Sequence, residues 1–178
     1  RINELHHPLT LPLDFEIKNL QNAGLNLKDI PSSKLASTLA SLLDPSLTWN
    51  DIDWLRSITS LPLILKGIMN PKDIQIAIVN DIETLIISNH GGRQLDTSLS
   101  SIETLKFMRG LDKVERTTII LDGGIRKGTD ILKALALGAK AVMIGRPILW
   151  GLAVGGEEGV KKVLAILKAE LDLAMALC

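Results

Sequence analysis

Four short hydrophobic runs divide the central and carboxyl-terminal parts of the chain at regular intervals. They occupy residues 62–66, 84–88, 118–122 and 141–145. Each run is nearly continuous in apolar residues rather than alternating, which is typical of parallel strands that are covered on both faces. Their length is that of strands rather than of helices. We therefore predict four parallel β-strands.

Amphipathic helical patterns lie between and after these runs, at residues 71–80, 100–109, 129–137 and 156–177. Pro71 suits the first turn of its helix, and Gly138 suits the position just after the end of another. A further helix is expected to begin at Thr48 as N-cap, with Asp51 three residues later. Strand, loop and helix repeat four times, which predicts an α/β fold with a parallel sheet.

Each predicted strand ends in a polar or glycine-containing segment, at residues 66–67, 88–93, 122–126 and 145–147. Polar residues gathered at the carboxyl ends of successive strands are typical of the active face of a (β/α)8 TIM barrel. A complete barrel takes about 250 residues, so four units make roughly half of one. Because phosphate-binding loops commonly follow the last two barrel strands, these four strands are predicted to be strands 5–8, with their helices.

The domain organisation follows from this pattern. Prolines and a glycine interrupt every candidate periodic run before residue 35, so residues 1–45 are predicted to be an irregular lead-in, flap and connecting segment. Residues 46–178 are predicted to form the second half of the barrel. The chain begins with Arg1 and ends abruptly at Cys178, and we expect it to be a piece of a longer chain.

The composition of the chain bears on which binding partners, disulfides and metals we expect. Lys and Arg total 20 and Asp and Glu total 20, so the net charge is zero and we expect neither nucleic acid nor a membrane as a partner. The single cysteine, Cys178, excludes a disulfide framework within the chain and fits a cytoplasmic location. The adjacent His6 and His7 lack an acidic or sulfur partner at ligand spacing, so no metal is expected.

Three side chains at strand ends are candidates for chemistry. Lys66 either reaches solvent or places a cation beside an electron-rich cofactor or an oxyanion. His90 follows a strand and precedes two glycines that leave room around it, so its imidazole could take a proton. Arg93, three residues later, could bind a carboxylate through two parallel hydrogen bonds.

Two glycine-rich loops are candidates for binding a phosphate. Residues 122–130 open a helix and include Arg126, and exposed backbone N–H groups at a helix start favour an anion. Gly145 and Arg146 form a second such loop after the next strand.

These segments together resemble the FMN-dependent α-hydroxy-acid oxidases and dehydrogenases, the family of glycolate oxidase, lactate oxidase and the flavin domain of flavocytochrome b2. The resemblance covers almost the whole chain, loosely before residue 45 and closely after it. The matching motifs, in order and spacing, are LPLILKG at 61–67, SNHGGRQLD at 88–96, LDGGIRKGTD at 121–130 and IGRP at 144–147.

The resemblance implies a role for each candidate. His90 would be the active-site base and Arg93 would bind the substrate carboxylate. Lys66 would lie by the flavin N1 and C2 oxygen, with Ser88 hydrogen-bonded to the same region and Asp122 close to the histidine and the FMN. The remaining residues implied to bind the cofactor, mainly at its phosphate, are Gly123, Gly124, Ile125, Arg126, Gly145 and Arg146.

The implied reaction is oxidation of a small (S)-2-hydroxy acid, of the L-lactate or glycolate type, to the 2-oxo acid. Oxygen, quinone and cytochrome users share these motifs, and O2 is the acceptor we expect. The full-length enzyme is expected to be a homo-oligomer. Arg1 falls where the family has a second substrate arginine on a mobile flap.

The chain departs from the family in ways that bear on activity. The first four barrel strands are absent, together with two active-site tyrosines, and the chain contains no tyrosine. Residues 80–83 replace a glycine-containing turn before the sixth strand, far from the active face. We therefore expect the isolated chain to be inactive or nearly so.

Two other interpretations stay open on the sequence. The segment 122–126 is also similar to that of inosine monophosphate dehydrogenases, but those enzymes need a mid-barrel cysteine nucleophile and the only cysteine here is Cys178. The chain could also be a non-catalytic half-barrel fragment that acts only by assembly.

Overall fold

The computed structural model describes residues 44–108, 110–111 and 114–178, together with nine scattered residues between 21 and 41. The chain divides into two compact units, residues 1–59 and residues 60–178. The predicted lead-in over 1–45, with Arg1, His6 and His7, lies almost wholly outside the described residues.

The first unit contains helix α3, Asp51–Ile58. Thr48 donates from its backbone N and from Oγ1 to Asp51 Oδ2, at 2.5 and 3.1 Å. The two predicted residues therefore contact each other, but the N-cap position belongs to Asn50 and not to Thr48. The Asp51 carboxylate holds Thr48 in the turn that precedes the helix, and the N-cap lies two residues later than predicted.

The second unit is built on a four-stranded parallel sheet in the order β1-β2-β3-β4. The strands are β1 Ile64–Lys66, β2 Thr84–Ser88, β3 Thr118–Asp122 and β4 Ala141–Met143. Lys66 lies opposite Ile86, and Ser88 lies opposite Asp122. Strands that neighbour one another in chain order and all run parallel are what a section of a (β/α)8 barrel requires, so the predicted parallel sheet is confirmed.

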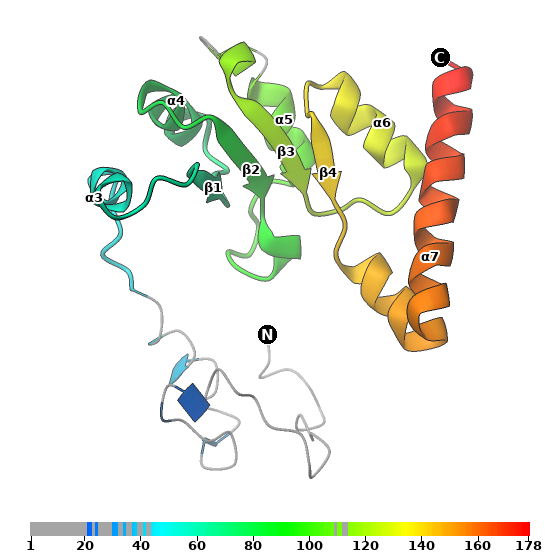
Figure 1. The fold of residues 1–178 in the computed structure, drawn as a ribbon, viewed down its shortest axis with the longest axis horizontal. Helices are drawn as coiled ribbons and strands as arrows, with labels where there is room; N and C mark the ends of the chain where they lie inside the picture. Colours follow the sequence, from blue (N-terminus) through cyan, green and yellow to red (C-terminus); the bar gives the residue numbers. More distant parts are fainter. Residues whose placement is uncertain are drawn as a thin grey trace. The chain divides into compact units, whose positions relative to one another are not determined.

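Helices alternate with these strands and follow one another beside the sheet in the same order (Figure 1). They are α4 Pro71–Val79, α5 Ser101–Met108, α6 Gly128–Ala136 and α7 Arg146–Ala176, with 3₁₀ turns η3 His90–Gly92 and η4 Val114–Arg116. Pro71 occupies the first turn of α4, and Gly138 adopts a φ of 105° just after α6, as the sequence predicts.

The bounds of α7 contain two helical segments on either side of a sharp kink. The backbone leaves helical geometry at Gly155 and Gly156, where φ is −144° and 55°, and glycine adopts a positive φ without a steric penalty. The segment after the kink is the helix that the sequence predicted over 156–177. The segment before the kink begins at Arg146, with Pro147 in its first turn, where the sequence indicated a loop at 145–147.

The two faces of the sheet differ in burial. Helices cover the face that carries Leu85, Ile87 and Leu121, which are all at most 1% exposed. The opposite face leaves Ile64 at the β1 edge 53% exposed and Met143 in β4 42% exposed. The prediction that the strands are covered on both faces is therefore wrong for this chain: successive side chains alternate between faces, and in a barrel the inner face is covered by the barrel's own remaining strands.

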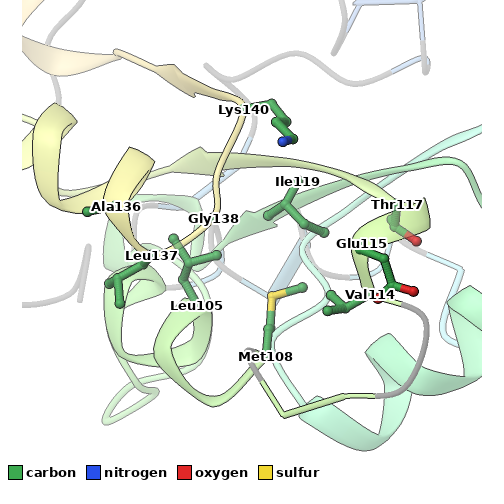
Figure 2. A pocket seen from close by; sticks show the side chains of 10 residues that line it. All are labelled: Leu105, Met108, Val114, Glu115, Thr117, Ile119, Ala136, Leu137, Gly138 and Lys140. Carbon is green, nitrogen blue, oxygen red and sulfur yellow. The ribbon is translucent and has the colours of Figure 1, made fainter.

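A pocket of about 330 Å³ opens at the amino-terminal end of β3 (Figure 2). Its lining is Leu105, Met108, Val114, Glu115, Thr117, Ile119, Ala136, Leu137, Gly138 and Lys140. The candidate catalytic residues follow the other, carboxyl-terminal ends of the strands, so this pocket is not part of the candidate site.

None of the helices in the described residues combines the length and the apolar character that crossing a membrane requires. Nor do the described residues contain a group of three or more His, Cys, Asp or Glu side chains arranged to hold a metal ion.

Candidate active site

Three side chains from three neighbouring strands meet at the carboxyl-terminal edge of the sheet. Lys66 Nζ, at the end of β1, donates to Ser88 Oγ at 3.0 Å and to Asp122 Oδ2 at 2.6 Å. Ser88 Oγ, at the end of β2, donates to Asp122 Oδ2 at 2.5 Å. The parallel register explains the meeting, because Ser88 and Asp122 are direct partners and all three lie on the same face of the sheet.

Ser88 also ties this cluster to the segment that carries His90. Its Oγ accepts a hydrogen bond from the backbone N of His90 at 3.0 Å. The Ser88 hydroxyl therefore accepts hydrogen bonds from Lys66 and from His90 and donates one to Asp122. These three bonds use the single donor and both lone pairs of the hydroxyl. Ser88 is 3% exposed, so these bonds are sheltered from water.

The pKa of Asp122 lies below its ordinary value of 3.8. Burial of the carboxyl is the largest single influence and acts to raise the pKa. The hydrogen bonds from Lys66 and Ser88, with the positive charge of Lys66 and that of His90 when it is protonated, together outweigh burial. Asp122 is therefore an anion that neutralises the Lys66 cation at the edge of the sheet.

The backbone around His90 adopts an unusual conformation. His90, Gly91 and Gly92 all have positive φ, at 54°, 65° and 73°. Glycine adopts this region of backbone conformation freely. A histidine there is uncommon, and its backbone conformation costs about 1 kcal/mol or more. The two glycines allow the chain to turn back on itself directly after β2.

Asn89 and Ser101 hold this turn from the side. Asn89 Oδ1 accepts from Gly92 N at 3.3 Å, and Asn89 Nδ2 donates to Leu99 O at 3.3 Å. The backbone N of Asn89 donates to Ser101 Oγ at 3.2 Å, from the first residue of α5. Gly123 must be small here, because a Cβ at this position would lie 3.0 Å from Asn89 Oδ1 and 3.2 Å from Ser101 Oγ.

His90 and Arg93 contact each other on the exposed side of the turn. Arg93 Nη2 lies 2.9 Å from His90 Nε2, and Arg93 Nε donates to His90 O at 3.4 Å. A basic imidazole nitrogen and a guanidinium that can hold a carboxylate are therefore adjacent and accessible.

Arg146 connects the last strand end to the same turn. Its Nη2, at the start of α7, donates to Gly91 O. A Cβ at position 91 would lie 2.5 Å from that Nη2 and would displace the guanidinium, and the φ of 65° at Gly91 itself favours glycine.

The glycine loops leave open backbone after β3 and β4. Gly124 has a φ of 80°, and a Cβ at Gly124 or Gly145 would meet nothing within 4 Å. Ile125 is 5% exposed and belongs to the buried core, whereas Arg126 is exposed.

Three backbone N–H groups at and just before the start of α6, where the sequence predicted exposed N–H groups for a phosphate, are hydrogen-bonded to carboxylates of the chain. Asp130 Oδ2 accepts from Arg126 N at 3.1 Å and from Lys127 N at 3.0 Å, and Glu170 Oε2 from α7 accepts from Gly128 N at 2.7 Å. These carboxylates satisfy the positive end of the helix themselves. The backbone at Gly124 and at Gly145 is open and could approach an anion.

Sequence reasoning missed four residues that shape the site: Asn89, Ser101, Asp130 and Glu170. The local signals existed for two of them, because Asn89 stands three residues before a glycine and Asp130 stands three residues after a helix N-cap. Ser101 and Glu170 act on residues 12 and 42 positions away. No local sequence pattern predicts contacts between residues this far apart in the chain.

Comparison with known proteins adds to this geometry. The family model for FMN-dependent dehydrogenases matches residues 1–178, which is the whole chain. The chain belongs to the FMN-dependent dehydrogenase family. The inosine monophosphate dehydrogenase alternative is therefore not favoured.

Curated relatives of this family member are oxidases by name. A 2-hydroxyacid oxidase of Dictyostelium discoideum is 50% identical over 177 residues, covering 99% of this chain and 45% of the relative. An L-lactate oxidase of Nostoc sp. is 45% identical over 180 residues, covering 99% of this chain and 49% of the relative. The chain thus spans about half the length of the curated relatives it matches.

Solved structures agree on the fold. A flavocytochrome b2 double mutant with pyruvate bound matches with a TM-score of 0.71 and 42% identity, over 76% of this chain and 36% of that one. Mandelate oxidase with benzoyl-formic acid matches with a TM-score of 0.67 and 42% identity, over 74% of this chain and 39% of that one. The prediction that the chain carries part of a (β/α)8 barrel is confirmed.

Proposed function

We propose that this chain supplies the carboxyl-terminal half of the active site of an FMN-dependent enzyme that oxidises a small (S)-2-hydroxy acid to the 2-oxo acid. L-lactate and glycolate are the substrates we favour. The observation that carries the proposal is the cluster of Lys66, Ser88 and Asp122 beside the His90–Arg93 pair, all following carboxyl ends of parallel strands.

The residues present fit FMN. Lys66 supplies a cation, and Ser88 supplies a buried hydroxyl, at the position proposed for the N1 and C2 oxygen of the flavin ring. Open backbone at Gly124 and Gly145, with the exposed Arg126 and Arg146, offers hydrogen-bond donors and positive charge for the phosphate. When bound, FMN would accept two electrons from the substrate.

The protein's own residues would bind and activate the substrate. Arg93 is positioned to hold the carboxylate through two parallel hydrogen bonds. His90 Nε2 would take up the proton that the substrate releases during oxidation. Lys66 would stabilise negative charge that develops nearby, since preorganised cations lower the free energy of such states.

The proposal extends to the whole protein. The acceptor that we favour is O2, in keeping with the oxidase names of the relatives. We also propose that the full-length enzyme is a homo-oligomer in the cytoplasm, and that the isolated chain does not turn over substrate. The last point is supported by the extent of the match, because the chain spans about half of each relative.

The test is an absorbance titration of the folded, purified chain with FMN, followed by L-lactate. We expect the flavin bands to shift on binding and then to stay unbleached when lactate is added. Lys66→Met should weaken FMN binding, whereas Lys72→Met on the exposed start of α4 should not. Failure of the folded wild-type chain to bind FMN, or equal binding by Lys66→Met, would contradict the assignment, and bleaching by lactate would contradict the predicted inactivity.

A further inference from the structure

The contact between Arg93 and His90 determines where the imidazole carries its proton. Arg93 Nη2 lies 2.9 Å from His90 Nε2. A guanidinium has five N–H donors and no acceptor, and it stays protonated in proteins. Nε2 must therefore accept this hydrogen bond through its lone pair, which leaves the single proton of the neutral ring on Nδ1.

The same contact occupies the atom that a base would use. A nitrogen can take a proton only through a free lone pair, and the lone pair of His90 Nε2 is engaged by Arg93. Arg93 Nε is also directed to His90, at its backbone oxygen at 3.4 Å. Both donors on one edge of the guanidinium are thus turned toward the histidine.

A carboxylate competes directly for that edge. Hydrogen bonds between a guanidinium and a carboxylate are charge-assisted and roughly twice as strong as those to a neutral acceptor. Both side chains are exposed, so a carboxylate in solution can reach Arg93. Its two oxygens would take the donors that now lie on His90, and His90 Nε2 would be released.

We propose that Arg93 masks the His90 base in the free protein and that the carboxylate of the substrate unmasks it. This inference rests on the proposed function. After release, the proton given up by the substrate forms the new bond at Nε2, its electron pair stays with the substrate, and the ring becomes an imidazolium. An alcohol without a carboxylate would leave the base masked, so the pair would select 2-hydroxy acids by activation as well as by binding.

The test is a nitrogen-15 NMR spectrum of the histidine rings of the full chain, recorded at a pH where imidazole is neutral. We expect the His90 proton on Nδ1 in the wild-type chain and a mixture of both tautomers in Arg93→Met. The His90→Gln variant assigns the signal, and His6 and His7 serve as internal controls. Acetate, compared with chloride at the same ionic strength, should shift the wild-type His90 signal toward that of Arg93→Met and leave Arg93→Met unchanged.

Several results would overturn the inference. These are a wild-type His90 proton on Nε2, the same spectrum for wild type and Arg93→Met, or an acetate effect no larger than that of chloride. The acetate experiment needs no variant, so it stands even if Arg93→Met fails to fold. None of these measurements uses FMN, so a chain that binds FMN but shows no masking would contradict this inference and leave the proposed function intact.

Discussion

At the scale of single residues, the candidate site depends on groups that serve more than one partner. Ser88 Oγ joins Lys66, Asp122 and the backbone of His90. A buried hydroxyl with all its hydrogen-bonding capacity used is costly to disturb, because removing it leaves its partners unsatisfied. The ion pair of Lys66 and Asp122 is less sheltered, with side chains 40% and 18% exposed.

Asp122→Asn tests how this ion pair contributes to stability. The pKa of Asp122 is lower in the folded chain than its ordinary value of 3.8. The ionised carboxylate therefore stabilises the fold at pH values above 3.8. This contribution is lost as the pH falls through the pKa that Asp122 has in the folded chain. We expect the variant to have a free energy of unfolding lower by about 0.5–1 kcal/mol at neutral pH, since exposed pairs are screened. Urea unfolding of the wild type and the variant at neutral and acidic pH measures this difference in the free energy of unfolding.

The matched control for this prediction is the double variant with Lys66→Met. If the two side chains act as a pair, Asp122→Asn should cost less in the Lys66→Met background than in the wild type. A difference between wild type and Asp122→Asn that grows as the solution is acidified would contradict the predicted direction of the pH dependence.

At the scale of secondary-structure elements, the first residue of α6, Gly128, is hydrogen-bonded to α7. Glu170 accepts a hydrogen bond from Gly128 N at 2.7 Å. A Cβ on Gly128 would lie 2.5 Å from the carbonyl carbon of Glu170, and closer still to the backbone N of Leu171. The two helix backbones touch at this point because position 128 has no side chain.

Gly128→Ala should therefore destabilise the chain. The added methyl group would push α6 away from α7, and overpacking of this kind costs about 1–3 kcal/mol in the free energy of unfolding. Gly110→Ala is the control, because a Cβ there meets nothing within 4 Å and should change stability by no more than about 0.5 kcal/mol. Thermal unfolding of the two variants compares them, and equal stabilities would disprove the close approach.

At the scale of the whole chain, the unusual feature is a sheet with one incompletely covered face. Ile64 is 53% exposed at the β1 edge, and Met143 is 42% exposed in β4. Within the described sheet β1 pairs only with β2, and β4 only with β3, so both outer strands present edges. Exposed edges with apolar side chains favour pairing with another chain. Each of the two edge strands is three residues long.

Ile64→Lys should reduce self-association of the isolated chain. A charged lysine on an edge strand opposes edge-to-edge pairing. Val79→Lys is the control, because Val79 is 70% exposed at the end of α4 and lies on no sheet edge. Sedimentation velocity should show a larger monomer fraction for Ile64→Lys than for wild type or Val79→Lys. A wild-type chain that is already monomeric would contradict the prediction.

The sequence alone determined the features that depend on neighbouring residues. Strands 84–88 and 118–122 have the predicted bounds, since continuous apolar runs between turn residues are a local signal. Pro71 stands where predicted, because its fixed φ suits the first turn of a helix and its missing N–H would have no partner there. Gly138 stands where predicted, because few residues other than glycine adopt its φ of 105°. The motifs at 61–67, 88–96, 121–130 and 144–147 supplied the candidate site residues without showing which of them contact one another.

Only the tertiary structure decided how those residues are combined. Lys66 and Asp122 are 56 positions apart, and their 2.6 Å contact depends on the register of three parallel strands. Glu170 accepts a hydrogen bond from the amide of Gly128 at the start of α6, where the sequence predicted exposed N–H groups, because α7 packs against the start of α6. Hydrophobic pattern and turn chemistry act over a few residues, whereas the distance between remote side chains is set by the packing of whole elements.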